Sequence, residues 1–166
     1  MNASAVIFDL DSTLASTLHR QHMLDAIRAG EATWDDYSLA CDHDEPLPAA
    51  IRLARLLFTG GQRIIILTGR GDIGRHQTGM WLRRHHVPCD LLLMRPRGDH
   101  RSNQEYKADV VADILAGKHG PYTPQLIVDD YPAAAETLEP LGVPVLTVDP
   151  RYPAGAPYGA PGTSGA

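Results

Sequence analysis

Two aspartates, Asp9 and Asp11, follow an apolar run at residues 5–8, in a segment that reads FDLDSTL from residue 8 to residue 14. Two carboxylates this close repel each other, and the repulsion raises their pKa values unless cations or hydrogen-bond donors compensate. Carboxylates bind divalent cations, and they also attack phosphorus to form aspartyl-phosphate intermediates. The pair therefore suggests metal binding or phosphoryl chemistry. The other polar residues of the chain have to show which of these two functions applies.

The same arrangement of an apolar run followed by polar residues recurs along the chain. The polar residues are Thr68, Gly69 and Arg70 after residues 63–67, Arg95 after residues 91–94, and Asp129 and Asp130 after residues 125–128. A lysine, Lys107, lies near the start of a predicted helix at residues 103–116. Each feature alone is weak evidence, because a Thr-Gly turn or an acidic helix start is common. The ordered set is much more specific than any member.

Short apolar runs and amphipathic segments alternate, which predicts an α/β fold with a parallel sheet and helices on both faces. The expected strands are residues 5–8, 63–67, 91–94, 125–128 and 145–148, and the expected helices are residues 14–29, 33–40, 47–59, 72–86, 103–116 and 132–141. This pattern describes a three-layer α/β/α, Rossmann-like domain with five strands. A ligand of such a sheet binds at the carboxyl ends of the strands.

The polar residues named above all fall at that edge, where clustered carboxylates need a cation. Mg²⁺ takes oxygen ligands, commonly one or two carboxylates with phosphate and water. We therefore interpret Asp9, Asp11 and one of Asp129 and Asp130 as a Mg²⁺ site. Thr68, the amides of Gly69 and Arg70, and Lys107 are then typical of a phosphate cradle.

The bulk composition fits one domain and excludes several classes of protein. The chain has 166 residues, 43% of them hydrophobic, and a net charge of −5. That balance gives no sign of a general polyanion binder, but residues 60–107 hold nine Lys and Arg against four acids, which suggests a local anionic ligand. Two cysteines without metal-binding spacing fit a reducing compartment, so we expect a cytoplasmic protein. We find no apolar run of membrane-spanning length and no signal-peptide pattern.

Two segments interrupt the regular alternation. Residues 15–46 stand between the first strand and the helix at residues 47–59, and we expect a small helical cap there. Residues 152–166 consist largely of Gly, Pro and Ala, which cannot build a core, so we expect a disordered tail after a domain at residues 1–151.

The chain resembles the haloacid dehalogenase superfamily of phosphohydrolases from Val6 to about Val148. Its four motifs appear in order as FDLDST at residues 8–13, LTGR at residues 67–70, Lys107, and VDD at residues 128–130. The resemblance implies that Asp9 is the nucleophile and Asp11 the general acid and base. It further implies that Thr68 and Lys107 orient the phosphoryl oxygens, and that Asp129 and Asp130 complete the Mg²⁺ site with Asp9 and Asp11.

Within that superfamily the details are similar to the 3′-phosphatase domain of phage-type polynucleotide kinase–phosphatases. The resemblance implies substrate-binding roles for Arg20, Arg70 and Arg95, to which we add Thr13 and Gly69 as candidates. Two positions depart from the usual pattern: Ser12 replaces glycine, and Asn103 replaces an aspartate four residues before Lys107. The neutral amide of Asn103 cannot neutralise Lys107. The sequence contains no GxxxxGK[ST] motif, so we expect no P-loop kinase within it.

The expected substrate is a phosphorylated nucleic-acid end, because a cap of about thirty residues is too small to roof a pocket. The basic segment at residues 95–101 supports that hypothesis, whereas Arg83, Arg84, His85 and His86 fit an ordinary helix surface at least as well. We infer no obligate protein partner and no membrane partner. Among phosphorylated ends, the sequence favours a 3′-phosphate.

Three alternatives use similar residues. A nucleotidase would act on free nucleoside monophosphates. A receiver-like signalling domain would carry its acceptor aspartate after the third strand, where this chain has Met94 and Arg95. An inactive scaffold would not need the complete motif set. The order of motifs disfavours the last two.

Overall fold

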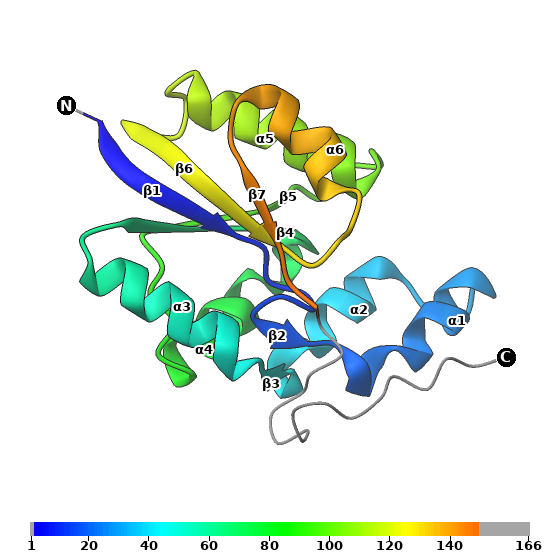
Figure 1. The fold of residues 1–166 in the computed structure, drawn as a ribbon. Coiled ribbons are helices and arrows are strands. Elements are labelled where there is room, and N and C mark those ends of the chain that lie inside the picture. Colours follow the sequence, from blue (N-terminus) through cyan, green and yellow to red (C-terminus); the bar gives the residue numbers. More distant parts are fainter. Residues whose placement is uncertain (1, 150–166) are drawn as a thin grey trace, which may run out of the picture.

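The computed structural model of the protein describes residues 2–149 and contains one five-stranded parallel sheet within that range (Figure 1). The strands are β1 (Ala3–Phe8), β4 (Arg63–Gly71), β5 (Leu91–Arg95), β6 (Tyr122–Asp129) and β7 (Val145–Thr147). They pair in the order β5-β4-β1-β6-β7, and every pairing is parallel. β1 therefore lies in the middle of the sheet, between β4 and β6.

Helices cover both faces of this sheet, which gives the three layers expected from the sequence. Figure 1 shows α3 (Pro48–Thr59) and α4 (Arg75–Arg84) on one face, and α5 (Asn103–Leu115) and α6 (Ala134–Leu138) on the other. Single turns of 3₁₀ helix precede α4 and follow α6, as η3 (Asp72–Gly74) and η4 (Glu139–Leu141). The predicted α/β class and three-layer architecture are confirmed.

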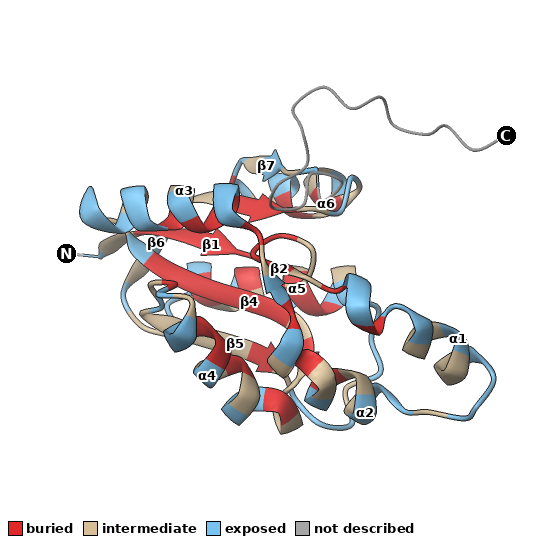
Figure 2. Ribbon diagram, turned by 90° about the horizontal axis from the view of Figure 1, so that it is seen from below, coloured by how far each residue is buried: buried red, intermediate tan, exposed pale blue. Residues whose placement is uncertain are grey.

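The middle stretches of the central strands β1 and β4 are apolar because both of their faces are buried there (Figure 2). Alternate residues contribute to two separate cores. One core packs against α3 and α4 and includes Val6, Phe8, Ile64 and Ile66; the other packs against α5 and α6 and includes Ala5, Ile7, Ile65 and Leu67. This packing fixes the register of β1 against β4, in which Phe8 pairs with Ile66. The residues that follow β1, β4 and β6 are thereby brought to one edge.

The insertion between β1 and α3 forms a small cap of short elements. It contains β2 (Ala15–Ser16), η1 (Leu18–Arg20), α1 (His22–Arg28), α2 (Trp34–Leu39), η2 (Ala40–His43) and β3 (Glu45–Pro46). β2 and β3 pair antiparallel at its base, with Ala15 opposite Pro46, and Figure 1 shows α1 and α2 projecting away from the sheet.

The single helix predicted at residues 14–29 is wrong, since an α-helix begins only at His22. Leu14 and Ala15 are fully buried beside the sheet, and Ala15 pairs with β3. A tertiary contact therefore replaces the local helical pattern in this segment.

Two further points concern the ends and the surface of the domain. Residues 152–166, for which the composition predicts disorder, lie outside the described residues. None of the helices within residues 2–149 combines the length and the hydrophobicity that a membrane span requires.

Candidate active site

Asp9 is the first residue after β1, and it is almost completely buried at the carboxyl edge of the sheet. Its backbone N–H donates to the carbonyl oxygen of Val128 at 2.9 Å, so the main chain still pairs with β6 at this point. Its Oδ1 lies 2.8 Å from Nζ of Lys107, and its Oδ2 accepts a hydrogen bond from Oγ1 of Thr13 at 3.1 Å. The two oxygens thus have different partners.

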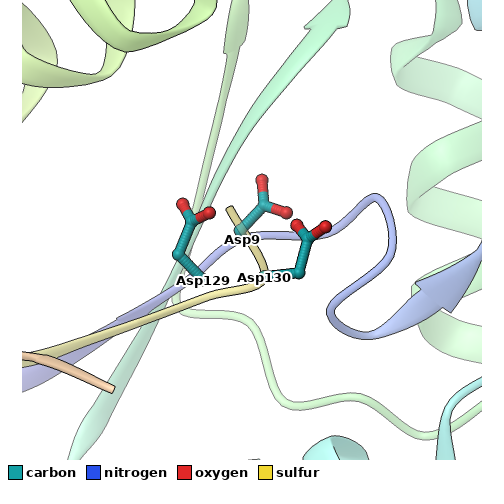
Figure 3. Close-up of side chains that lie close together, drawn as sticks. All are labelled: Asp9, Asp129 and Asp130. Atoms are coloured by element: carbon teal, nitrogen blue, oxygen red, sulfur yellow. The ribbon is translucent and has the colours of Figure 1, made fainter. Parts of the chain in front are cut away.

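Asp9, Asp129 and Asp130 form a carboxylate cluster in which one oxygen from each lies within 4.8 Å of the others (Figure 3). Lys107 Nζ donates to Oδ2 of Asp129 at 2.6 Å, and the N–H of Tyr131 donates to its Oδ1 at 3.0 Å. Three carboxylates against one ammonium leave an excess of negative charge. Their oxygens are the donor type that Mg²⁺ prefers, so these residues fit the ion that the sequence predicts.

The pKa of Asp9 shows the effect of this crowding. Burial raises it most, and Asp129 and Asp11 add to the rise; Lys107 opposes it, and the net result is a pKa of about 7. The pKa of Asp130 is also raised, first by burial and then by Asp129. Burial lowers the pKa of Lys107, but Asp9 and Asp129 outweigh burial and raise it overall, so the lysine stays protonated. A divalent cation would favour the ionised form of Asp9.

Asp11 lies beside this cluster, but its carboxylate is held by two arginines. Its Oδ1 accepts from Nη2 of Arg20 at 2.6 Å and from Nε of Arg70 at 2.8 Å. Burial alone would raise the pKa of Asp11, but Arg70 and Arg20 outweigh burial and lower it. The cluster of three carboxylates does not include Asp11, although the sequence predicted it as a fourth metal ligand.

Asp44, in the cap immediately before β3, is a site residue that the sequence analysis missed. Its carboxylate is fully buried and accepts from Nε and Nη2 of Arg20, both at 2.8 Å, and from Arg70. His19 Nε2 lies 2.8 Å from its Oδ1. Asp44 and Asp11 therefore share both arginines, and Nη2 of each arginine donates to both carboxylates. Its signal in the sequence was one acid among several in a polar segment, and nothing local marked it as buried.

The cap also fixes the arginines through other contacts. The guanidinium of Arg20 lies over the ring of Tyr37 at 4.1 Å and donates to the Tyr37 carbonyl oxygen at 3.1 Å. Ser38 Oγ accepts from the N–H of Gly71 at 3.1 Å. α2 is thereby joined to the end of β4, where Arg70 lies.

The last residues of β4 lie against the start of α5. A Cβ at Gly69 would come 2.2 Å from Oδ1 of Asn103, so only glycine fits here without movement of the Asn103 side chain. Arg95 bridges the two, since its Nε donates to the Gly69 carbonyl at 3.2 Å and its Nη2 to Oδ1 of Asn103 at 3.3 Å. Asn103 thus positions Arg95 rather than contacting Lys107. Thr68 is fully buried and accepts from the N–H of Arg70 at 3.2 Å.

The backbone conformation of Ser12 explains why glycine is the usual residue at this position of the motif. Ser12 has φ 65°, in the left-handed region that a Cβ disfavours. Its N–H donates to the Ala15 carbonyl at 2.7 Å, and its Oγ lies 3.3 Å from Oγ1 of Thr17. The turn reverses the chain between Asp11 and Thr13, so that Thr13 returns to Asp9.

The predicted site residues therefore fall into two adjoining groups and the flanking ends of two strands. The first group is Asp9, Thr13, Lys107, Asp129 and Asp130; the second is Asp11, Arg20 and Arg70, with Asp44; the strand ends carry Thr68 and Gly69 in β4 and Arg95 in β5. An α/β/α sheet with these residues at its carboxyl edge is the arrangement expected from the resemblance to haloacid dehalogenase-type phosphatases.

The comparisons with known proteins specify the family. Residues 3–151 match the family model described as the polynucleotide kinase PNKP phosphatase domain. The chain belongs to this family and is a phosphatase domain of that type. A comparison with curated protein sequences gives no match.

Solved structures agree with the fold. One chain of the Pnkp1/Rnl/Hen1 complex is 24% identical and superposes with a TM-score of 0.71 over 89% of this chain and 46% of that chain. This protein therefore spans less than half of that neighbour. A haloacid dehalogenase-like hydrolase from Bacteroides fragilis is 18% identical, with a TM-score of 0.62 over 89% and 88% of the two chains. A class C acid phosphatase from Bacillus anthracis, solved with tungstate, is 19% identical, with a TM-score of 0.57 over 81% and 54%.

Proposed function

We propose that the protein is a Mg²⁺-dependent phosphomonoesterase that removes 3′-phosphates from polynucleotide ends through an aspartyl-phosphate intermediate. The observation that carries this proposal is that the two oxygens of Asp9 have different partners. Oδ1 contacts Lys107, Oδ2 accepts a hydrogen bond from Thr13, and the whole carboxylate lies in a cluster with Asp129 and Asp130. The family match supports the polynucleotide substrate.

In the first step an oxygen of Asp9 forms a bond to phosphorus while the bond from phosphorus to the 3′-oxygen breaks. Asp11 donates a proton to the departing 3′-oxygen, which leaves as a hydroxyl. In the second step Asp11 takes a proton from water, and that water attacks the phosphorus and releases Asp9 and inorganic phosphate. This sequence is covalent catalysis combined with general acid and base catalysis.

The other side chains orient and neutralise the phosphoryl group. In this proposal Lys107 and Thr68 contact its oxygens, and the Arg20–Arg70 pair contributes two further cations. Asp9, Asp129 and Asp130 would hold Mg²⁺. When bound, the ion would offset the charge of the carboxylates and of the phosphate.

The arginines also explain how Asp11 can serve as an acid although its pKa is lowered in the free protein. The negative charge of a phosphate that binds Arg20 and Arg70 offsets part of their positive charge. The stabilisation of ionised Asp11 then weakens, and its pKa rises toward the value that a proton donor requires. Substrate binding itself would thus prepare the general acid.

The decisive experiment compares three substrates under one condition: an oligonucleotide with a 3′-phosphate, the same oligonucleotide with a 5′-phosphate, and free nucleoside monophosphates. We expect release of inorganic phosphate from the 3′-phosphorylated strand with the highest kcat/KM. A reaction confined to free nucleotides would replace this proposal by a nucleotidase. Pairs of DNA and RNA strands with the same sequence then determine the sugar preference.

A further inference from the structure

A cavity of about 310 Å³ lies apart from the catalytic residues, between α3 and the end of α4. None of the residues assigned above to the catalytic site lines it. Its lining consists of Pro46, Pro48, Ile51, Arg52, Arg55, Arg84, His85 and His86. Three arginines and two histidines around one hollow form an unusual concentration of cationic side chains in a protein of net charge −5.

The arginines at this cavity have no carboxylate partners within the described residues. Among residues 2–149, the arginines that make no ion pair are Arg52, Arg55, Arg75, Arg83 and Arg84. Three of these five line the cavity. Most other arginines in the same range are matched by acids, so the positive charge at the cavity is left for a ligand or solvent to balance.

The contacts that these arginines do make hold two of them in place without neutralising them. Arg55 donates to the carbonyl oxygens of His85 and His86, at 2.5 and 3.0 Å, which ties α3 to the end of α4. Arg84 donates to the carbonyl oxygen of Asp42 at 3.1 Å. Carbonyls carry no net charge, so both guanidiniums keep theirs. Within the described part of the chain, Arg52 is exposed and has neither a hydrogen bond nor an ion pair.

The pKa of His85 is affected by the positive charge around the cavity. Its pKa is lowered first by burial and then by Arg84, His86 and Arg55. The neutral imidazole packs against the ring of Trp81 with 4.6 Å between the centroids. A flat, neutral ring beside cationic side chains offers a surface for a base or sugar as well as a charge for a phosphate.

The inner wall of the cavity is apolar. Ile51 is buried in the core, and Pro46 and Pro48 complete the wall at the base of the cap. A purely inorganic anion would leave this wall uncovered. A nucleotide carries both an apolar part and a charged part, and the volume lies at the lower end of the range for small-molecule sites, about 300–1,000 Å³.

We propose that this cavity is a second, non-catalytic site that binds one nucleoside phosphate unit of the substrate strand, and this proposal rests on the proposed function. The apolar wall with His85 takes the sugar or base, and Arg52 and Arg84 take the phosphodiester. Trp81 connects the two sites, because its ring contacts His85 and its Nε1 donates to the Asp44 carbonyl at 2.6 Å. The proposal therefore requires that a strand with its 3′-phosphate at Asp9 be long enough to reach the cavity.

The test uses the double variant R52A/R84A, because neither arginine contributes to the core and Arg55 keeps α4 tied to α3. The matched control is R75A/R83A, which removes two arginines that also make no ion pair within residues 2–149 but lie outside the cavity. KM and kcat are measured for 3′-phosphorylated strands of two to ten nucleotides and for p-nitrophenyl phosphate. We expect R52A/R84A to raise KM for the long strands about tenfold. We expect no change in kcat, in dinucleotide KM or in p-nitrophenyl phosphate hydrolysis.

Salt dependence gives a second readout. For long strands, the slope of log KM against log salt should fall by about 0.7 for each phosphate that R52A/R84A no longer neutralises, and the control should keep the wild-type slope. Equal KM values for wild type and R52A/R84A at every length would overturn the proposal. A rise in KM that is as large for p-nitrophenyl phosphate would also overturn it, because the effect would then act through the catalytic site.

Direct binding separates failure of this proposal from failure of the proposed function. Trp81 fluorescence is titrated in a Trp34→Phe background, because Trp34 is the second tryptophan of the chain and is exposed in the cap. The ligands are a 3′-hydroxyl oligonucleotide and a free nucleoside monophosphate, neither of which needs turnover. Oligonucleotide binding that R52A/R84A loses and R75A/R83A keeps supports the cavity even if no 3′-phosphate is hydrolysed. Binding of the mononucleotide alone would overturn the strand site in favour of a small-molecule site.

Discussion

The carboxylate cluster around Asp9 and the arginine cluster around Asp11 lie side by side but have opposite electrostatic balance. The first holds three carboxylates against one lysine, and the pKa of Asp9 is raised to about 7. The second holds Asp11 and Asp44 against Arg20 and Arg70, and the pKa of Asp11 is lowered. The first cluster is thus incomplete without a further cation, whereas the second is already balanced. Two aspartates only two residues apart acquire different chemistry from this difference.

The largest effect is expected for Asp9→Asn, which keeps the shape of the side chain but removes the nucleophile. Turnover of any phosphomonoester should fall by about 10⁴-fold or more, as for removal of other covalent nucleophiles. Stability without metal should be unchanged or slightly higher, because the substitution relieves the crowding of three carboxylates. Phosphate release and thermal unfolding measure the two results. Retained turnover would refute the nucleophile assignment.

The second effect tests whether the arginine cluster needs both of its acids. Asp44→Asn leaves Arg20 and Arg70 buried with only Asp11, so the free energy of unfolding should fall by about 3–5 kcal/mol, the usual cost of breaking a buried ion pair. The matched control is Asp42→Asn, on the same segment of the cap. Denaturant unfolding of both variants checks this prediction. Equal stability of the two would show that Asp44 is not a structural partner of the arginines.

The third effect tests whether the carboxylate cluster around Asp9 binds a divalent cation. Without metal, Asp9 binds a proton up to about pH 7 in the folded state, whereas the unfolded state releases it near the ordinary aspartate pKa of 3.8. Its contribution to stability therefore falls as the pH rises through this window. Mg²⁺ has to displace that proton, so its apparent Kd should be about tenfold weaker at pH 6 than at pH 8.

Thermal unfolding with and without Mg²⁺ at the two pH values measures this effect, since a ligand of the folded state raises Tm. EDTA should abolish both the shift and the activity. In Asp9→Asn the pH dependence of the Mg²⁺ shift should become smaller, and Asp130, whose pKa is also raised, accounts for what is left. A shift of equal size at both pH values in the wild type would argue against Asp9 as a ligand.

The smallest effect concerns the turn that separates the two clusters. Ser12→Gly removes the Cβ from a residue with φ 65°, which should relieve about 1 kcal/mol of left-handed strain. Removal of the Ser12 hydroxyl from Thr17 and the greater freedom of glycine in the unfolded chain offset part of this gain. We expect a net change below about 1 kcal/mol by denaturant unfolding and unchanged kcat. A large loss of activity would show that the Ser12 hydroxyl takes part in catalysis.

The sequence predicted the sheet well because its strands are buried on both faces. The runs at residues 63–67 and 125–128 are too apolar for a solvent-exposed segment and lack the spacing of an amphipathic helix. They lie within β4 and β6. The same property fixed which residues follow each strand, and so the edge at which they meet. The helix predicted at residues 14–29 failed because Ala15 pairs with β3 across the cap, which no local pattern encodes.

The sequence by itself thus determined the class of fold, the family and which motif residues lie near the carboxyl edge of the sheet, since these depend on hydrophobic period and on motif order along the chain. Only the tertiary structure decided how the carboxylates divide. Asp44 joins Arg20 and Arg70 from the far end of the cap, and Asp11 turns toward them rather than toward Asp129. Which charges end as neighbours depends on the packing of distant segments, and in a buried site that arrangement sets each pKa.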